Sequence, residues 1–133
     1  MVIGHKIHGS GSERVFMFND WLADCTSYEP MLPYLDLEKF TYALTDLRGY
    51  GRSRGIKGQY TAEEAASDTF ELADNLGWDR FHIVGYSMTG MVVERMAIDE
   101  EDRIKSVVAI GPVSAGGAAL TDDEREFFLS TIV

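Results

Sequence analysis

Short apolar runs alternate with longer amphipathic stretches along most of this chain. The runs at 14–18, 40–45, 81–84 and 103–111 are rich in β-branched and aromatic residues, which predicts strands. Helical spacing follows in three places, through 27–35, from Thr61 to near Gly77, and over 91–98. The alternation predicts an α/β fold, a mostly parallel sheet with helices on both faces.

Two helix starts carry capping signatures. Thr61 and Glu64 have the spacing of a capping box, and Gly77 is the expected C′ residue of the same helix. A second box at 121–124 precedes Phe127, Phe128, Leu129 and Ile132, which predicts a final amphipathic helix.

The candidate chemistry lies in the segment from Gly85 to Gly90, between a predicted strand and a predicted helix. Its sequence is Gly-Tyr-Ser-Met-Thr-Gly. A tight turn there lifts the hydroxyl of Ser87 off the sheet and points the first helical N–H groups at whatever binds. Ser87 is therefore a candidate nucleophile.

This segment resembles the nucleophile elbow, G-x-S-x-G, of the α/β-hydrolase superfamily. Thr89 stands where the motif has its second glycine, and Gly90 follows one step later. The loop 46–53, Asp-Leu-Arg-Gly-Tyr-Gly-Arg-Ser, also resembles a D-x-R-G-x-G-x-S loop of that superfamily. The resemblance extends to about Pro112. It implies that residues 1–113 form the N-terminal part of a hydrolase core and that 114–133 lead toward a cap.

A serine hydrolase needs a base and an acid besides its nucleophile. In the family that this segment resembles, the base and the acid both follow the serine. In this chain His5, His8 and His82 all precede Ser87. His82 is five residues upstream on the same predicted strand, roughly 16 Å away. His5 and His8, three apart on a strand, face opposite sides and form no metal site. We expect the acid and histidine from sequence beyond residue 133 or from a second chain, and read these residues as the N-terminal half of a hydrolase.

The resemblance also implies an oxyanion site built from two backbone N–H groups. Met88, directly after the nucleophile, supplies one, and Trp21 supplies the other. Many relatives have His-Gly before that second donor, whereas this chain has Asn19-Asp20. We expect the Asp20 carboxylate to point away from the site and to bond loop N–H groups.

Residues near the nucleophile are expected to shape the substrate pocket. Tyr86, Tyr28 and Asp20 are the candidate substrate-binding residues. Asp46 and Arg48 lie on a loop that faces the active site in this fold, and two interpretations remain open for them: substrate binding, or an ion pair that holds the turn.

Composition excludes several partners. Twelve basic and twenty-two acidic residues give a net charge of −10, which disfavours nucleic acid and anionic membranes. The single cysteine, Cys25, suits a reducing compartment. With no signal-peptide core or transmembrane run, we expect a cytoplasmic protein that uses no cofactor or metal.

The sequence thus predicts a hydrolase that acts on a small-molecule ester, lactone or related acyl compound through Ser87. Related epoxide hydrolases and haloalkane dehalogenases use an aspartate nucleophile, and the segment around Ser87 looks like the esterase, enol-lactonase and cofactor-free haloperoxidase group. The alternative is a binding or association module that keeps the fold without catalysis. The absent downstream histidine, Thr89 and the Asn19-Asp20 pair favour that alternative.

Overall fold

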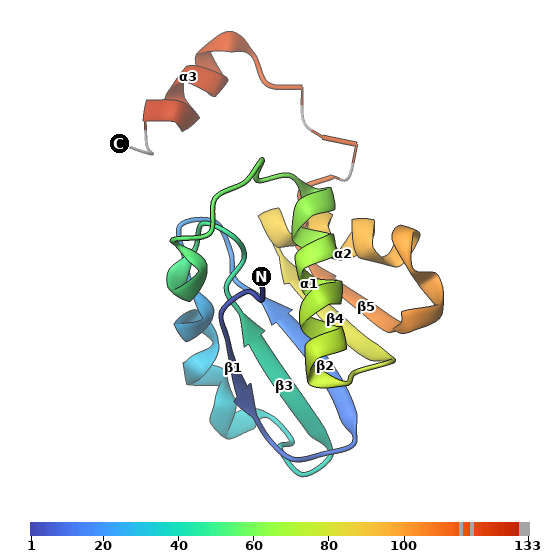
Figure 1. Cartoon of the computed structure of the whole chain (residues 1–133). Helices are drawn as coiled ribbons and strands as arrows, with labels where there is room; N and C mark the ends of the chain where they lie inside the picture. The colour runs from blue at the N-terminus through green and yellow to red at the C-terminus, as the bar shows by residue number, and fades with distance from the viewer. Residues whose placement is uncertain (115, 118, 131–133) are drawn as a thin grey trace.

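A five-stranded sheet organises the chain (Figure 1). The computed structural model describes residues 1–114, 116–117 and 119–130. The strands are β1 (His5–His8), β2 (Glu13–Phe18), β3 (Phe40–Thr45), β4 (Phe81–Tyr86) and β5 (Ile104–Ile110), in the order β1-β3-β2-β4-β5. Four strands run parallel and β1 is antiparallel to β3. The predicted mostly parallel α/β sheet is confirmed, with strand bounds close to those expected.

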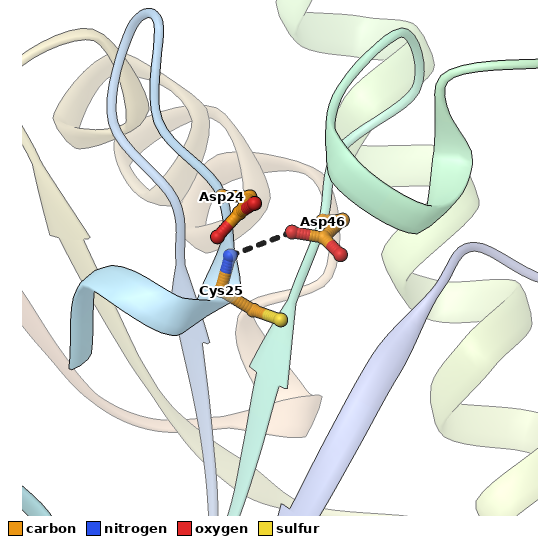
Figure 2. Close-up of side chains that lie close together, drawn as sticks. All are labelled: Asp24, Cys25 and Asp46. Carbon is orange, nitrogen blue, oxygen red and sulfur yellow. Dashed lines mark hydrogen bonds between the residues drawn. The ribbon is translucent and has the colours of Figure 1, made fainter. Parts of the chain in front are cut away.

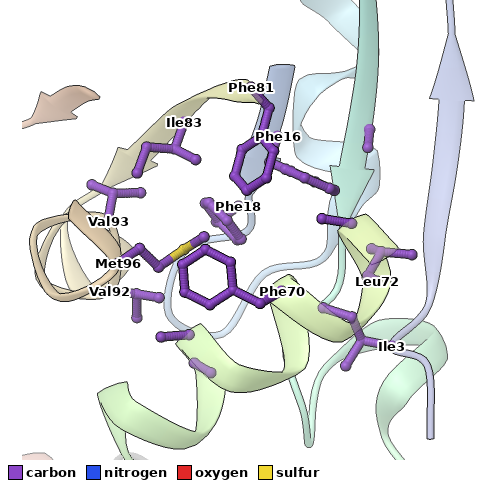
Figure 3. Close-up of a cluster of buried hydrophobic side chains, with 14 of the residues drawn as sticks. Ile3, Phe16, Phe18, Phe70, Leu72, Phe81, Ile83, Val92, Val93 and Met96 are labelled. Carbon is purple, nitrogen blue, oxygen red and sulfur yellow. The ribbon is translucent and has the colours of Figure 1, made fainter. Parts of the chain in front are cut away.

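Two α-helices cover one face of the sheet. These are α1 (Ala62–Leu76) and α2 (Met88–Asp99). They enclose the larger core, which is shown in Figure 3 and in which Phe16 and Phe81 meet edge to face, 4.9 Å between ring centroids. Because α2 follows β4 directly and both elements pack in this core, their packing fixes the turn between them.

The opposite face is covered by a 3₁₀ element, η1 (Cys25–Tyr34). A smaller core of Val15, Met17, Cys25, Tyr42 and Leu44 lies beneath it. The sequence predicts helix in this region, and the structure gives it a tighter form. Pro30 and Pro33 lie inside the element, and each removes a backbone N–H and clashes with the preceding turn of an α-helix.

The ends of α1 follow the predicted caps. The Glu64 amide donates to the Thr61 hydroxyl at 3.2 Å, and Gly77 has the left-handed conformation, φ 66°. The Glu64 carboxylate differs from a standard capping box, because it accepts from the amides of Gln59 and Tyr60 instead of that of Thr61. The box therefore also fixes the loop that leads into the helix.

Two short 3₁₀ turns, η2 (Gly51–Ser53) and η3 (Glu101–Arg103), complete the core, and α3 (Asp122–Ser130) follows it. Figure 1 shows α3 standing off the end of the sheet where β2 and β4 finish. Its capping box is present, since the Thr121 amide donates to Glu124 at 2.9 Å and the Glu124 amide donates to the Thr121 hydroxyl. The predicted Ile132 lies outside the described residues, as do Ala115 and Ala118 of the segment leading to α3.

Within the described residues, none of the helices combines the length and apolar character needed to cross a lipid bilayer.

Candidate active site

Ser87 lies at the turn between β4 and α2, in a backbone conformation that residues other than glycine rarely adopt. Its φ is 53° and its ψ is −112°. The strain is held by hydrogen bonds on both sides: the Ser87 amide donates to Ile110 O at 3.0 Å, and its carbonyl accepts from the amides of Gly90 and Val113. The hydroxyl does not cap the helix. It is therefore presented at the helix N-terminus instead of being used by the backbone.

Thr89, which stands where the motif has glycine, fits into the turn because its hydroxyl bonds the backbone of Tyr86. Thr89 is fully buried, and Oγ1 accepts from the Tyr86 amide at 3.0 Å and donates to the Tyr86 carbonyl at 3.1 Å. Its backbone lies against Gly85, where a Cβ would fall 2.3 Å from Thr89 O. The close approach of strand and helix thus falls on Gly85, and the threonine fits beside it.

Gly90 lets the helix approach the chain that leaves β5. A Cβ on Gly90 would lie 2.4 Å from Pro112 Cβ and 2.7 Å from Pro112 Cα. The second glycine, one step later than in the motif, therefore serves a packing contact of its own, against Pro112.

The loops that follow β2, β3 and β4 meet at one edge of the sheet. The register pairs Phe18 with Thr45 and Met17 with Val84, so Asp20 and Ser87 each lie three residues past the paired positions Met17 and Val84. In parallel sheets this carboxyl edge is where ligands bind. The predicted oxyanion loop and Ser87 therefore follow neighbouring parallel strands at this edge.

Asn19, which sequence reasoning noted only as a departure from His-Gly, organises the loop after β2. Its side chain is fully buried, with Oδ1 accepting from the Leu47 amide at 2.9 Å. Its Nδ2 donates to the carbonyls of Asp20 and Ala23, at 3.0 and 3.2 Å. The side chain therefore ties the loop after β2 to the loop after β3.

Asp20 does not make the predicted bonds to loop N–H groups through its Oδ1. That oxygen is shielded from solvent and has no hydrogen-bond partner among the described residues. Its charge acts on two tyrosines: burial, with the charges of Asp20 and Tyr86, raises the pKa of Tyr28 to about 12, and burial and Asp20 also raise the pKa of Tyr50. The charge of Asp20 thus acts on one tyrosine of η1 and on one tyrosine of the loop after β3.

The tyrosines and Trp21 contribute differently from one another. The Tyr28 hydroxyl donates to Phe18 O at 2.5 Å, so its ring, not its oxygen, is available to a ligand. Tyr86 is exposed and directly precedes Ser87. The ring of Trp21 lies edge to face with Phe128 of α3, 5.7 Å between centroids.

A cavity of about 160 Å³ lies beside Met88, between α1, α2 and the loop after β3. It is lined by Leu47, Arg48, Tyr50, Tyr60, Thr61, Ala62, Ala65, Met88, Met91 and Val92. Tyr50 connects this cavity to the elbow, because its hydroxyl lies 3.5 Å from the Met88 sulfur. Sequence reasoning missed Tyr50, although it stands in the middle of the recognised 46–53 loop.

Arg48 and Asp46 both have structural roles, but they do not pair with each other. Arg48 forms a two-pronged pair with Asp68 of α1, at 2.9 and 2.6 Å, and also pairs with Glu64 at 3.0 Å. Asp46 is fully buried and accepts from the amides of Cys25 and Arg52, at 2.6 and 3.0 Å. Of the two interpretations, the turn-holding one fits these contacts, with different partners from those expected.

Asp24, Cys25 and Asp46 form a further cluster (Figure 2), with ligand atoms within 4.8 Å of one another. Both Asp46 oxygens already accept amides, and Asp24 Oδ1 caps η1 through the Thr26 amide at 2.8 Å. Burial above all, and the charge of Asp46, raise the pKa of the Cys25 thiol to about 11, so the thiol is protonated at neutral pH. The cluster joins η1 to β3 and is poorly suited to a metal.

None of the three histidines is placed beside Ser87. His82 is partly buried on β4 and bonds Ser106 Oγ at 2.7 Å and Glu13 Oε2 at 3.1 Å. His5 and His8 lie on β1, at the far edge of the sheet. Within the described residues, the elbow therefore has no imidazole base.

Comparison with known proteins places this geometry in a family. Residues 13–130 match the family described as alpha/beta hydrolase fold. The chain is 38% identical over 77 residues to a fluoroacetate dehalogenase of Burkholderia sp, covering 54% of the chain and 25% of that protein. It is 32% identical over 103 residues to a pimeloyl-[acyl-carrier protein] methyl ester esterase of Legionella pneumophila (strain Lens), covering 77% and 39%.

A solved structure agrees. The bromoperoxidase from Bacillus anthracis superposes with a TM-score of 0.83 at 29% identity, covering 96% of this chain and 49% of that one. The chain spans less than half the length of each of these three relatives. With the strained serine at the strand-to-helix turn and a family match over most of its length, this chain belongs to the α/β-hydrolase fold family.

Proposed function

We propose that Ser87 is the nucleophile of a hydrolase that cleaves a small-molecule ester, lactone or related acyl compound. One observation carries the proposal: Ser87 is held at φ 53° by its neighbours, with its hydroxyl unused by the helix that begins at Met88. Strain of this kind persists where the surrounding structure enforces it and is concentrated at functional sites.

In the proposed reaction, Ser87 Oγ attacks the substrate carbonyl carbon and forms a tetrahedral oxyanion. The amides of Met88 and Trp21 donate to that oxyanion, and the N-terminus of α2 adds its dipole. Collapse expels the alcohol and leaves an acyl group on Ser87, which water then removes. Two of the matched relatives are named as an esterase and a dehalogenase; a serine at the elbow favours the ester chemistry, because dehalogenases of this fold use aspartate.

The base and acid are proposed to come from a further segment or a second chain. The exposure of β5 supports the proposal of such a partner. It is an edge strand in which three apolar side chains are exposed by 39 to 47%, those of Val107, Val108 and Ile110. Their side chains point to both faces of the strand, and soluble proteins usually protect such an edge. A partner that pairs with β5 would place its own loops at the carboxyl edge, near Ser87.

Acetylation of Ser87 tests the proposal directly. The chain would be incubated with p-nitrophenyl acetate, with and without imidazole as a substitute base, then quenched and mapped by mass spectrometry. We expect acetyl-Ser87, increased by imidazole, and its loss in Ser87→Ala but not in Ser27→Ala, which removes an exposed hydroxyl on η1. Acetylation confined to lysines would contradict the proposal.

A non-catalytic binding module is the second candidate. The observation in its favour is that the histidines of the described chain bond elsewhere or lie on β1, away from Ser87. Saturable binding of an ester without acetylation of Ser87, with or without imidazole, would decide for this candidate.

A further inference from the structure

The proposed reaction leaves unused the cavity of about 160 Å³ that lies between α1, α2 and the loop after β3. Its buried wall is apolar and includes Leu47, Ala65 and Val92, which are 3 to 8% exposed. Met88 and Met91 extend that wall, and methionine side chains adapt to the shape of what they contact. Protein interiors hold few voids larger than a water molecule, so a space of this size, with this lining, indicates a ligand site.

Two polar side chains of the cavity wall, those of Arg48 and Thr61, are already engaged. Arg48 donates to Asp68 at 2.9 and 2.6 Å and to the Lys57 carbonyl at 2.8 Å. The Thr61 hydroxyl accepts from the Glu64 amide at 3.2 Å. Water in the cavity therefore finds few polar partners, and an apolar group that displaces poorly held water gains affinity.

Two tyrosines of the wall are fixed in place. Tyr60 is 61% exposed, so it forms the rim, and its φ of 57° is strained for a residue other than glycine. Glu64 accepts from the Tyr60 amide at 2.8 Å, and the Tyr60 ring lies against Gly49, where a Cβ would fall 2.9 Å from Cε1. The Tyr50 hydroxyl lies 3.5 Å from the Met88 sulfur. Strain that the surroundings enforce is concentrated at functional sites and ligand clamps, so the rim supports a binding role.

We infer that this cavity is a binding site for a compact, uncharged apolar group: a single aromatic ring, or an alkyl group of the same bulk. An apolar cavity of about 150 Å³ holds one benzene molecule, which sets the size. A charged group would lose its hydration against the apolar wall, and the Arg48 guanidinium is already paired with Asp68 and Glu64. The inference goes beyond the proposed hydrolase and does not depend on the chemistry of Ser87.

Titration of the 133-residue chain with toluene and with N-methylpyridinium tests the inference. The two probes have nearly the same shape, but N-methylpyridinium is a cation, which the net charge of −10 attracts without any specific site. In NMR titrations, we expect toluene to shift the methyl resonances of Ala65, Met88, Met91 and Val92. Toluene should bind at least about tenfold more tightly than N-methylpyridinium.

Filling the cavity should remove toluene binding. Ala65→Leu adds three carbons to the buried wall, and Ala62→Leu adds the same group where α1 begins. Each should weaken toluene binding by at least about tenfold. Ala97→Leu is the matched control, because Ala97 lies on α2 and does not line this cavity; it should bind toluene as the unchanged chain does. The spectrum of each free variant reports whether it is folded, and Ala62→Leu decides if Ala65→Leu does not fold.

Four results would overturn the inference. Three are equal binding of the two probes, toluene binding that survives in a folded filled variant, and toluene shifts confined to residues outside the cavity. The fourth is a dimer that does not respond to toluene, since a side chain of a second copy would then occupy the space. Acetylation of Ser87 is measured separately, so the hydrolase proposal and this site stand or fall independently.

Discussion

The hydroxyl of Thr89 bonds both backbone groups of Tyr86, accepting from its amide at 3.0 Å and donating to its carbonyl at 3.1 Å. Tyr86 directly precedes the strained Ser87, so these two bonds hold one side of the turn that contains Ser87. A β-branched residue in place of the motif's glycine thus becomes part of the elbow's support.

Thr89→Val, which keeps the shape and removes the hydroxyl, should lower the free energy of unfolding by about 1–3 kcal/mol. The reason is that the Tyr86 amide and carbonyl lose a partner in a partly buried place. Thr89→Ser keeps the hydroxyl and should retain most of that stability. Urea denaturation of the three proteins measures the difference, and a loss in Thr89→Ser with none in Thr89→Val would show that the methyl group, not the bonds, matters.

Gly90→Ala should destabilise the protein even though alanine favours helices. The added Cβ would lie 2.4 Å from Pro112 Cβ, so α2 or the chain leaving β5 must shift, which typically costs about 1–3 kcal/mol. Gly55→Ala is the control, since a Cβ there meets nothing within 4 Å. A rise in the thermal midpoint of Gly90→Ala, as helix propensity alone would give, would refute the packing role.

Arg48→Lys should lower the urea midpoint more than Arg95→Lys. Both arginines make two-pronged pairs with an aspartate, Arg48 with Asp68 and Arg95 with Asp99. Lysine cannot reproduce that fork. The first pair is shielded, with the Asp68 side chain 5% exposed, whereas the second is exposed by 41% and 30%, and exposed pairs contribute little. Equal midpoints would show that the Arg48 pair is no more important than a surface pair.

The Cys25 thiol should resist alkylation while the chain is folded. Burial and Asp46 raise its pKa to about 11, and the thiolate is the reactive form. Because the raised pKa applies only to the folded state, stability should be full below the ordinary thiol pKa and should fall as the pH rises through about 11. Iodoacetamide at neutral pH should modify Cys25 only after urea is added; rapid modification of the folded chain would contradict the burial.

Most of the fold was predictable because its signals are local. Strand composition, the Thr61 cap, Gly77 and the elbow around Ser87 all depend on neighbouring residues, and the structure places each near its expected position. Helical spacing alone does not distinguish the 3₁₀ form of η1 from an α-helix. Pro30 and Pro33 are the residues in the sequence that indicate the 3₁₀ form.

The long-range contacts were not predictable from spacing. Arg48 pairs with Asp68, twenty residues away on α1, instead of with the nearby Asp46. Asn19, just after β2, bonds Leu47, which lies just after the neighbouring strand β3. Such pairs depend on how loops meet at the edge of the sheet, and one sequence contains no signal for that meeting.

The measurement that tests the central claim most directly is the intact mass of the chain after exposure to a fluorophosphonate, followed by peptide mapping. It would be made on the chain alone and with a C-terminal polypeptide that supplies an acid and a histidine, with Ser87→Ala alongside. We predict a single label on Ser87 when the second polypeptide is present and none in Ser87→Ala. Labelling of Ser87 in the chain alone would support the nucleophile without the partner, and an unlabelled Ser87 under both conditions would contradict the account.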